Sequence, residues 1–250
     1  MIYVTGDWHG GFGPEGFWND RFDAERFPEG LGLTKRDLVI VLGDFSWPFD
    51  FSDEEESDMA TLARKPWVTC FLDGNHEHFD YLDGLRVSEW RGGAVQRYPE
   101  FPSLIHLMRG QVYELEGKRV LVMGGAQSAG GWREPGLTWF EREMPSTDEM
   151  QACRQALDAV DWQVDYVLSH TCASSLLPAA LGAQDGNSAG AGAHGSVVTD
   201  QLTDFFEELE GKLTYTHWYF GHFHRDDDID ARHTVLFDTI LPLGGTLFPA

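Results

Sequence analysis

The amino-acid sequence predicts an α/β sandwich whose sheets contain both parallel and antiparallel strands. Short apolar runs alternate with segments of helical character along most of the chain, which is the pattern of strands connected by helices. Residues 104–126 are instead predicted to form consecutive strands, and such a run makes the sheets mixed. With 250 residues, of which 42% are hydrophobic, the chain can build a substantial core. We therefore expect one domain over residues 1–250, with loop insertions at about 10–30, 127–140 and 184–196.

Three buried strands are predicted in the first third of the chain. Each is a short apolar run, and they cover residues 2–4, 37–42 and 67–72. Residues 10–30 have no clear period, so we expect a long loop there with one helical turn near 20–27. Ser52 is expected to cap an acidic first turn, from which a helix continues to about Arg64.

The middle of the chain is predicted to contain a helical turn at 79–85, an irregular stretch, and then three strands. These strands cover residues 105–108, 111–115 and 118–123. The last two are separated only by Glu116 and Gly117, which form a plausible hairpin turn.

Helices and strands are predicted to alternate again in the last part of the chain. Ser146 and Glu149 have the spacing of a capping box, which starts a helix. Thr199 is expected to cap a second helix that ends at Gly211. The predicted strands cover residues 164–168, 215–220 and 231–240.

The charge and cysteine content restrict the class of protein. The chain has 41 acidic and 18 basic residues, and its formal charge of -23 disfavours long nucleic acids and anionic membranes as partners. A small anionic substrate remains compatible, because bound cations can invert the local potential. No apolar run has the length of a membrane span, and no basic start or apolar segment of a signal peptide precedes Asp7. The three cysteines are scattered, so we expect no disulfide framework and a cytoplasmic location.

Polar side chains of the kind that bind metals follow five of the predicted strands. Each lies in or next to a turn that contains glycine or polar residues, where the backbone can bend sharply. The residues are Asp7, His9, Asp44, Asn75, His76, His170, His222 and His224. Imidazole and carboxylate ligands together suit first-row divalent metals, whereas the lack of thiolates disfavours a structural zinc site.

The number of these groups favours two metal ions. One metal that keeps a position for substrate rarely needs seven ligands, whereas two metals sharing a carboxylate would use Asp7, His9, Asp44, Asn75, His170, His222 and His224. Asp44 is the expected bridge, because it is the only carboxylate at its strand end.

The ordered motifs resemble those of the calcineurin-like metallophosphoesterase superfamily. They are Asp7-x-His9, Gly43-Asp44, Gly74-Asn75-His76-Glu77, His170 and Gly221-His222-x-His224, which span most of the chain. The resemblance implies two mixed sheets packed face to face and flanked by helices. It implies a first metal held by Asp7, His9, Asp44 and His224. It implies a second metal held by Asp44, Asn75, His170 and His222. The reaction implied is hydrolysis of a phosphoester, because two such ions can clamp a phosphoryl group and lower the pKa of a shared water, whose hydroxide attacks phosphorus.

The same resemblance implies that His76 is the catalytic histidine rather than a ligand. Placed beside Asn75, it can protonate the leaving group or bind a phosphate oxygen. Glu77 is expected to orient one of the nearby histidines. Manganese or iron is the expected metal, with zinc, nickel, cobalt and magnesium as alternatives.

The sequence departs from the protein-phosphatase branch of that superfamily. Those enzymes typically carry an arginine after each of the Gly-Asp and Gly-Asn-His-Glu motifs, and neither arginine is present at the corresponding places here. Arg133 is the best substitute as a phosphate clamp, although a surface arginine that balances local acids is an equal alternative. A dedicated protein phosphatase is therefore disfavoured, and the expected substrate is a small phosphoester.

Two other functions are compatible with these motifs. A nucleotide phosphodiesterase or nuclease would use the same site and prefer diesters, although the acidic charge disfavours long polymers. A non-catalytic, metal-bound scaffold would present residues 184–196 to a protein partner, but the presence of His76 with all seven ligands disfavours it. His78, His106, His194, His217 and His233 are interpreted as core, surface or loop residues.

Overall fold

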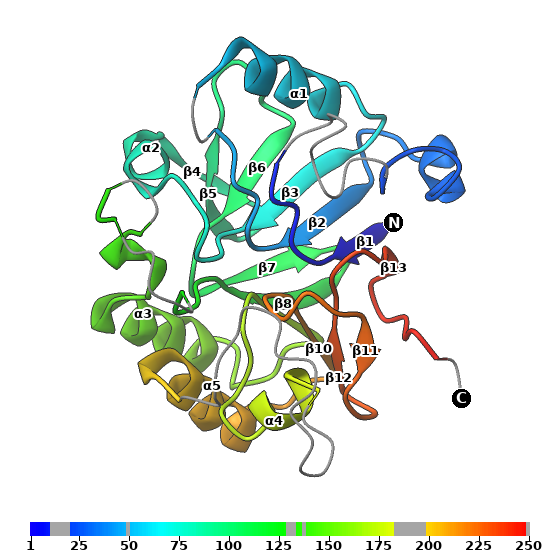
Figure 1. Ribbon diagram of the computed structural model, residues 1–250. Coiled ribbons are helices and arrows are strands. Elements are labelled where there is room, and N and C mark those ends of the chain that lie inside the picture. The colour runs from blue at the N-terminus through cyan, green and yellow to red at the C-terminus, as the bar shows by residue number, and fades with distance from the viewer. Residues whose placement is uncertain (11–20, 49–50, 129–133, 137–138, 183–198, 249–250) are drawn as a thin grey trace.

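The computed structural model describes residues 1–10, 21–48, 51–128, 134–136, 139–182 and 199–248. Within them, two β-sheets lie face to face between two layers of helices (Figure 1). The seven-stranded sheet has the order β13-β1-β2-β3-β6-β5-β4, and the six-stranded sheet has the order β11-β12-β10-β9-β8-β7. The predicted α/β sandwich with mixed sheets is therefore confirmed.

The seven-stranded sheet has a parallel centre and antiparallel edges. Its strands are β1 (Ile2–Thr5), β2 (Leu38–Leu42), β3 (Val68–Leu72), β4 (Val87–Trp90), β5 (Gly93–Arg97), β6 (Leu104–Leu107) and β13 (Leu241–Pro242). Strands β1, β2, β3 and β6 are mutually parallel, whereas β5, β4 and β13 pair antiparallel to their neighbours. The carboxyl ends of the four parallel strands thus lie at one edge.

The six-stranded sheet is built in the same way. Its strands are β7 (Gln111–Leu115), β8 (Lys118–Met123), β9 (Tyr166–Ser169), β10 (His217–Phe220), β11 (Asp227–Asp228) and β12 (His233–Val235). Strands β8, β9, β10 and β12 are parallel. Strands β7 and β8 form the predicted hairpin, and both Glu116 and Gly117 have the positive φ that a tight two-residue hairpin turn requires.

Helices cover the outer face of each sheet. The α-helices are α1 (Asp53–Ala63), α2 (Phe79–Gly84), α3 (Thr147–Asp158), α4 (Leu177–Ala180) and α5 (Gln201–Lys212), and the 3-10 helices are η1 (Pro28–Gly32) and η2 (Glu141–Glu143). Helix α1 lies on the seven-stranded side, and α3 and α5 lie on the six-stranded side (Figure 1). The predicted caps at Ser52 and Ser146 are both present. None of the helices in these described segments is long and apolar enough to cross a membrane.

The central strands of each sheet are apolar on both faces, because one face packs against the other sheet and the other face packs against helices. In β2, Leu38, Ile40 and Leu42 pack into the core between the sheets, while Val39 and Val41 pack under the outer helices. The alternation of side chains along a strand explains this division. The cysteines behave as core residues: Cys70, Cys153 and Cys172 are all free and buried.

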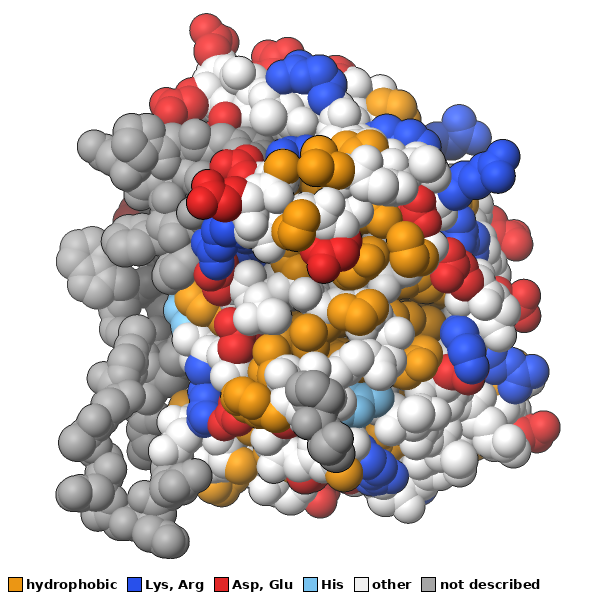
Figure 2. Space-filling view, turned by 90° about the vertical axis from the view of Figure 1, so that its right-hand side faces the viewer, with side chains coloured by type: hydrophobic (Ala, Val, Ile, Leu, Met, Phe, Trp, Pro, Cys, Tyr) orange, Lys and Arg blue, Asp and Glu red, His pale blue; other side chains and the backbone are white. Residues whose placement is uncertain are grey.

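The side of the molecule that carries β1, β13 and the two chain ends is partly apolar. Hydrophobic side chains gather in the middle of this face, and charged side chains lie mainly around them (Figure 2). The segment after β13 contributes Leu243 and Leu247, which are partly buried against the core between the sheets. This segment therefore covers one edge of that core.

Four local predictions were wrong. The stretch predicted as irregular contains β4 and β5, and the predicted strand 231–240 is reduced to β12, with β13 only beginning at Leu241. The cap of α5 is Asp200 rather than Thr199, because the Asp200 carboxylate accepts the free amide hydrogens of the first turn. The helical turn expected near 20–27 is instead η1, at Pro28–Gly32. Residues 184–196 lie outside the described residues, as do parts of the other two expected insertions.

Candidate metal centre

The polar residues predicted at the strand ends meet between the two sheets. Asp7 and His9 follow β1, Asp44 follows β2 and Asn75 follows β3, all in the seven-stranded sheet. His170 follows β9, and His222 and His224 follow β10, both in the six-stranded sheet. Because the parallel strands of both sheets end on the same side, two groups of side chains from separate sheets can share one site.

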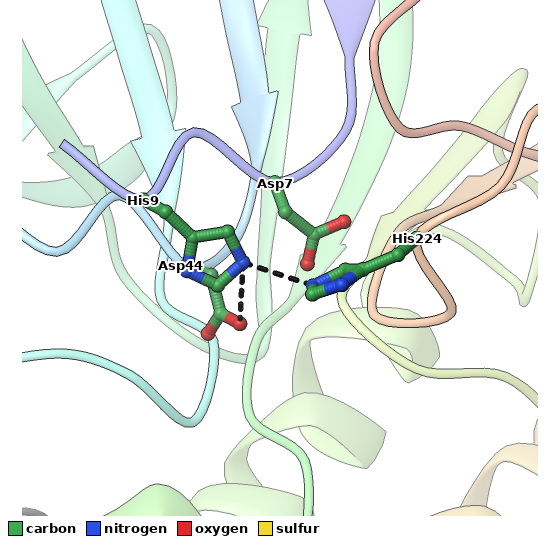
Figure 3. A group of neighbouring side chains, drawn as sticks. All are labelled: Asp7, His9, Asp44 and His224. Atoms are coloured by element: carbon green, nitrogen blue, oxygen red, sulfur yellow. Dashed lines mark hydrogen bonds and ion pairs between the residues drawn. The ribbon is translucent and has the colours of Figure 1, made fainter. Parts of the chain in front are cut away.

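Four of these residues form a compact group, which is the set predicted for the first metal. One ligand atom each of Asp7, His9, Asp44 and His224 lies within 4.8 Å of the others. The Nε2 atoms of His9 and His224 are 2.9 Å apart, and Nε2 of His9 is 3.7 Å from Oδ2 of Asp44 (Figure 3). Neighbouring ligands on an ion bound at ~2.1 Å are about 3 Å apart, so this donor set fits a divalent metal.

The residues predicted for the second metal surround His170. Its Nε2 atom lies 3.2 Å from Oδ1 of Asn75 and 3.3 Å from Oδ1 of Asp44. The ring of His222 is near as well, with its centroid 5.0 Å from that of His170. Asp44 is therefore shared: one carboxylate oxygen faces His9 and the other faces His170.

The ligands occupy unusual backbone conformations. His9, Asp44, His222 and His224 all have positive φ, between 48° and 71°. Non-glycine residues rarely adopt this region, and its cost is tolerated mainly where the surrounding structure fixes the chain for a function. The turns after β1, β2 and β10 thus keep an unfavourable backbone conformation that directs the ligand side chains toward one another.

Two glycines allow the ligand segments to approach one another. A Cβ atom at Gly43 would lie 2.2 Å from Nδ1 of His170, and one at Gly74 would lie 2.1 Å from Oδ1 of Asp44. No side chain fits at either place without moving a ligand. The glycines of the Gly-Asp and Gly-Asn-His motifs therefore make room for ligands from other strands.

Hydrogen bonds orient the ligands from behind. The Nδ1 atom of His170 lies 2.7 Å from the carbonyl oxygen of Leu42, which leaves Nε2 directed at Asp44. Both carboxylate oxygens of Asp7 accept the backbone N–H of His222, at 3.0 Å. These contacts also connect the two sheets at the site.

Burial and neighbouring charges shift the ionisation of the ligands. Burial raises the pKa of Asp7 to about 7, although the charge of His170 acts against this shift. Burial also acts to raise the pKa of Asp44, but His170 and His9 hold it well below its ordinary range. Burial disfavours the charged form of His170, whereas Asp44 and Asp7 together raise its pKa to about 10. Protons and metal ions therefore compete for the same buried groups.

The expectation that Glu77 orients a histidine was wrong. This buried carboxylate accepts the backbone N–H groups of Phe45 at 2.8 Å, Ser46 at 2.9 Å and Gly74 at 3.1 Å. Burial raises its pKa to about 8, and the charge of Asp44 adds to the shift. Glu77 thus ties together the turns after β2 and β3, which carry Asp44 and Asn75.

His76 lies beside the metal ligands, on the exposed side of the centre. The His76 side chain is exposed, its ring centroid is 5.7 Å from that of His9, and its backbone N–H donates to Oδ1 of Asp44 at 2.8 Å. It therefore lies at the open side of the centre. Arg133 lies outside the described residues. The histidines interpreted as structural include His106, which contacts Asp73, and His217, which contacts Thr234.

Three supporting residues were not predicted from the sequence. Arg21 is buried and donates to the backbone oxygens of Gly6 and Asp7, which holds the turn after β1. Ser128 and Glu143 form a hydrogen-bonded pair behind Asn75. No motif marks these residues, because their roles depend on which distant segment they contact.

One comparison with known proteins identifies a family for this chain. A family model described as calcineurin-like phosphoesterase matches residues 1–226. A search of curated proteins finds no match.

Proposed function

The chain belongs to the calcineurin-like phosphoesterase family, and we propose that it is a dinuclear, metal-dependent hydrolase of small phosphoesters. The observation that carries the proposal is the position of Asp44. Its two carboxylate oxygens face two separate groups of ligands, as a bridging ligand between two ions must. Family membership supports phosphoester hydrolysis in general, and the bridging geometry supports two metals rather than one.

In this proposal the two metals divide the seven ligands. The first is held by Asp7, His9, Asp44 and His224. The second is held by Asp44, Asn75, His170 and His222. When bound, two divalent ions would supply Lewis acidity toward a phosphoryl oxygen and lower the pKa of a bound water. Manganese or iron suits this mixture of imidazole, carboxylate and amide ligands.

His76 is proposed as the acid that serves the leaving group. Its side chain is exposed at the open side of the centre, close to His9, while its backbone is fixed by Asp44. An imidazole in this place can donate a proton to the leaving oxygen or bind a phosphate oxygen. Its removal should therefore lower turnover without removing a metal.

Hydrolysis by metal-reconstituted protein tests the function. We expect turnover of p-nitrophenyl phosphate or of its bis ester, and the ratio of the two rates identifies the class of ester. His76→Ala should lower kcat by about 100-fold or more, as expected for loss of a general acid, while two metals stay bound. His78→Asn is the matched control, because asparagine can also cap α2, as the His78 side chain does.

Two outcomes would contradict the proposal at different levels. If protein with two bound metals hydrolyses neither ester nor any member of a broad phosphoester panel, the function is wrong. If His76→Ala keeps the turnover of the parent protein, only the role of His76 is wrong.

A further inference from the structure

A buried hydrogen-bonded relay lies behind the second group of ligands. It consists of Glu143 in η2, Ser128 in the segment after β8, and Asn75 in the turn after β3. All three side chains are buried, with Glu143 only 1% exposed. A buried carboxylate needs hydrogen-bond donors. One donor to Glu143 is Ser128, which in turn contacts the proposed metal ligand Asn75.

Each hydrogen bond of the relay has a defined donor and acceptor. Oε1 of Glu143 accepts the backbone N–H of Ser128 at 3.0 Å and the indole N–H of Trp139 at 2.9 Å. Oε2 accepts the hydroxyl hydrogen of Ser128 at 2.6 Å, a short distance typical of a charge-assisted bond. Ser128 Oγ in turn accepts Nδ2–H of Asn75 at 3.2 Å.

This direction decides which end of the Asn75 amide faces the metal centre. A serine hydroxyl has one hydrogen, and here that hydrogen is directed at a carboxylate that only accepts. Ser128 Oγ can then only accept from Asn75, so the amide nitrogen must lie on the Ser128 side. The amide oxygen is left on the side of His170, 3.2 Å from its Nε2 atom. A reversed amide would present N–H groups to a cation.

Glu143 itself is held in place from the same part of the fold. The Arg109 guanidinium donates to the backbone oxygens of Arg142 at 2.7 Å and Glu143 at 3.2 Å, and its Nε–H donates to Asp73 at 2.6 Å. Asp73 lies two residues before Asn75, and its backbone oxygen accepts the N–H of Gly125. The relay therefore joins two segments whose relative position is already fixed.

We propose that Glu143 is a positioning residue that acts through Ser128 to keep the amide oxygen of Asn75 directed at the second metal. The proposal rests on the proposed function, because it takes Asn75 as a metal ligand. It adds a residue outside the seven proposed ligands. The affinity of the second metal site then depends on whether the Ser128 hydroxyl donates its hydrogen to Glu143 or to Asn75.

Glu143→Gln should reverse the relay with little change in shape. The two N–H donors at Oε1 require an oxygen there, so the new amide nitrogen must occupy the place of Oε2. It then donates to Ser128 Oγ, and the Ser128 hydrogen turns toward Asn75. The Asn75 amide is expected to rotate and to present its nitrogen to the metal.

The measurement is titration of the metal-free protein with Mn²⁺. Binding is monitored by calorimetry and by the electron paramagnetic resonance signal of a coupled manganese pair. We expect Glu143→Gln to weaken the second site about 10- to 100-fold, the usual effect of a lost outer-shell partner, and to leave the first site unchanged. Ser128→Ala should weaken the second site by less, because it removes the relay without reversing it. Glu141→Gln, at an exposed position of the same 3-10 helix, is the matched control.

The double variant separates positioning from a merely structural role. Adding Ser128→Ala to Glu143→Gln removes the misdirected hydroxyl, so the second site should recover to the affinity of Ser128→Ala alone. Additive losses in the double variant, or an unchanged second site in Glu143→Gln, would overturn the inference. If Glu143→Gln does not fold, Ser128→Ala carries the test by itself, and an unchanged second-site affinity overturns the inference.

Failure of the inference differs visibly from failure of the proposed function. A parent protein that binds two manganese ions and hydrolyses phosphoesters, with Glu143→Gln indistinguishable from it, refutes the relay alone. A parent protein that binds only one ion, or hydrolyses nothing, refutes the proposed function.

Discussion

The role of each residue at this site depends on its close contacts as well as on its residue type. Asp44 combines a positive φ, burial and contacts from each carboxylate oxygen to a different histidine. Glu77 is equally buried but serves three backbone N–H groups. Two neighbouring carboxylates thus have different roles, because one faces imidazoles and the other faces amides.

Asp44→Asn is the sharpest test of the shared carboxylate. The substitution removes a negative charge between the two ligand groups, so metal binding should weaken at both sites and kcat should fall by about 1,000-fold or more. Metal content by mass spectrometry and hydrolysis of p-nitrophenyl phosphate measure the two effects. Asp80→Asn, on the exposed face of α2, should change neither. Full occupancy of two metals in Asp44→Asn would contradict the bridging role.

His217 should make the folded protein sensitive to mild acid. Burial lowers its pKa to about 4, with a contribution from His233, whereas an unfolded histidine titrates near ~6.5. Between these values the unfolded chain binds a proton that the folded chain does not, so stability falls as the pH falls from about 6.5 toward 4. The loss is on the order of 1 kcal/mol after allowance for solvent screening.

The measurement is urea unfolding of the parent protein and of His217→Asn at pH 7 and pH 5. The variant should lose less stability between the two pH values than the parent does. Any loss of metal at low pH lowers the stability of both proteins equally, so it cancels when the two stability losses are compared. Equal losses in the two proteins would show that His217 does not carry this dependence.

At the scale of elements, the strand-end turns are the decisive local structures. In each, an apolar strand stops at a glycine or polar turn that carries one or two of the candidate metal ligands. The turns after β2 and β3 are also tied to one another through Glu77. A change in one turn should therefore disturb ligands that belong to another.

Gly74→Ala tests this coupling. The added Cβ would lie 2.1 Å from Oδ1 and 2.3 Å from the backbone nitrogen of Asp44, so the turn after β3 or Asp44 must move. We expect weaker metal binding, loss of most activity and a stability loss of about 1–3 kcal/mol, typical of overpacking. Gly84→Ala is the matched control, since nothing lies within 4 Å of its added Cβ. Normal metal content in Gly74→Ala would contradict the coupling.

At the scale of the whole molecule, the candidate centre joins the two sheets. The seven-stranded sheet contributes Asp7, His9, Asp44 and Asn75, and the six-stranded sheet contributes His170, His222 and His224. A bound metal therefore connects the two sheets at one edge, and its binding free energy adds to the stability of their packing.

Removal of metal should lower the thermal stability of the whole protein. Binding at 100 times the dissociation constant stabilises the folded state by about 2.7 kcal/mol per site. Calorimetry before and after chelation should show a drop in Tm of several degrees, restored by added Mn²⁺. His224→Ala should respond less to the chelator, because it already lacks a ligand. An unchanged Tm after verified removal of metal would contradict the link between the sheets.

The sequence predicted what depends on local order along the chain. Apolar runs followed by glycine or polar residues located β1, β2, β3, β9 and β10, and the Glu116-Gly117 pair located the β7–β8 hairpin. The strand β4 was missed because it is an exposed edge strand with neither a continuous apolar run nor a buried face. The strand β5 was missed because its sequence, Gly-Ala-Val-Gln-Arg, lacks a continuous apolar run although it is largely buried. Metal roles and the catalytic role of His76 stay predictions that the experiments above test.

The fold class, the family motifs and the set of side chains available to bind metal follow from residue type and spacing along the chain. Three contacts emerge only from the folded arrangement: Asp44 faces two groups at once, Glu77 holds turns rather than histidines, and Glu143 lies behind Asn75. Several of those contacts join residues far apart in the chain: Glu77 and Ser46 are 31 positions apart, and Asn75 and Ser128 are 53 positions apart. No local pattern carries such information, because it arises only when the carboxyl ends of two sheets are brought to one edge.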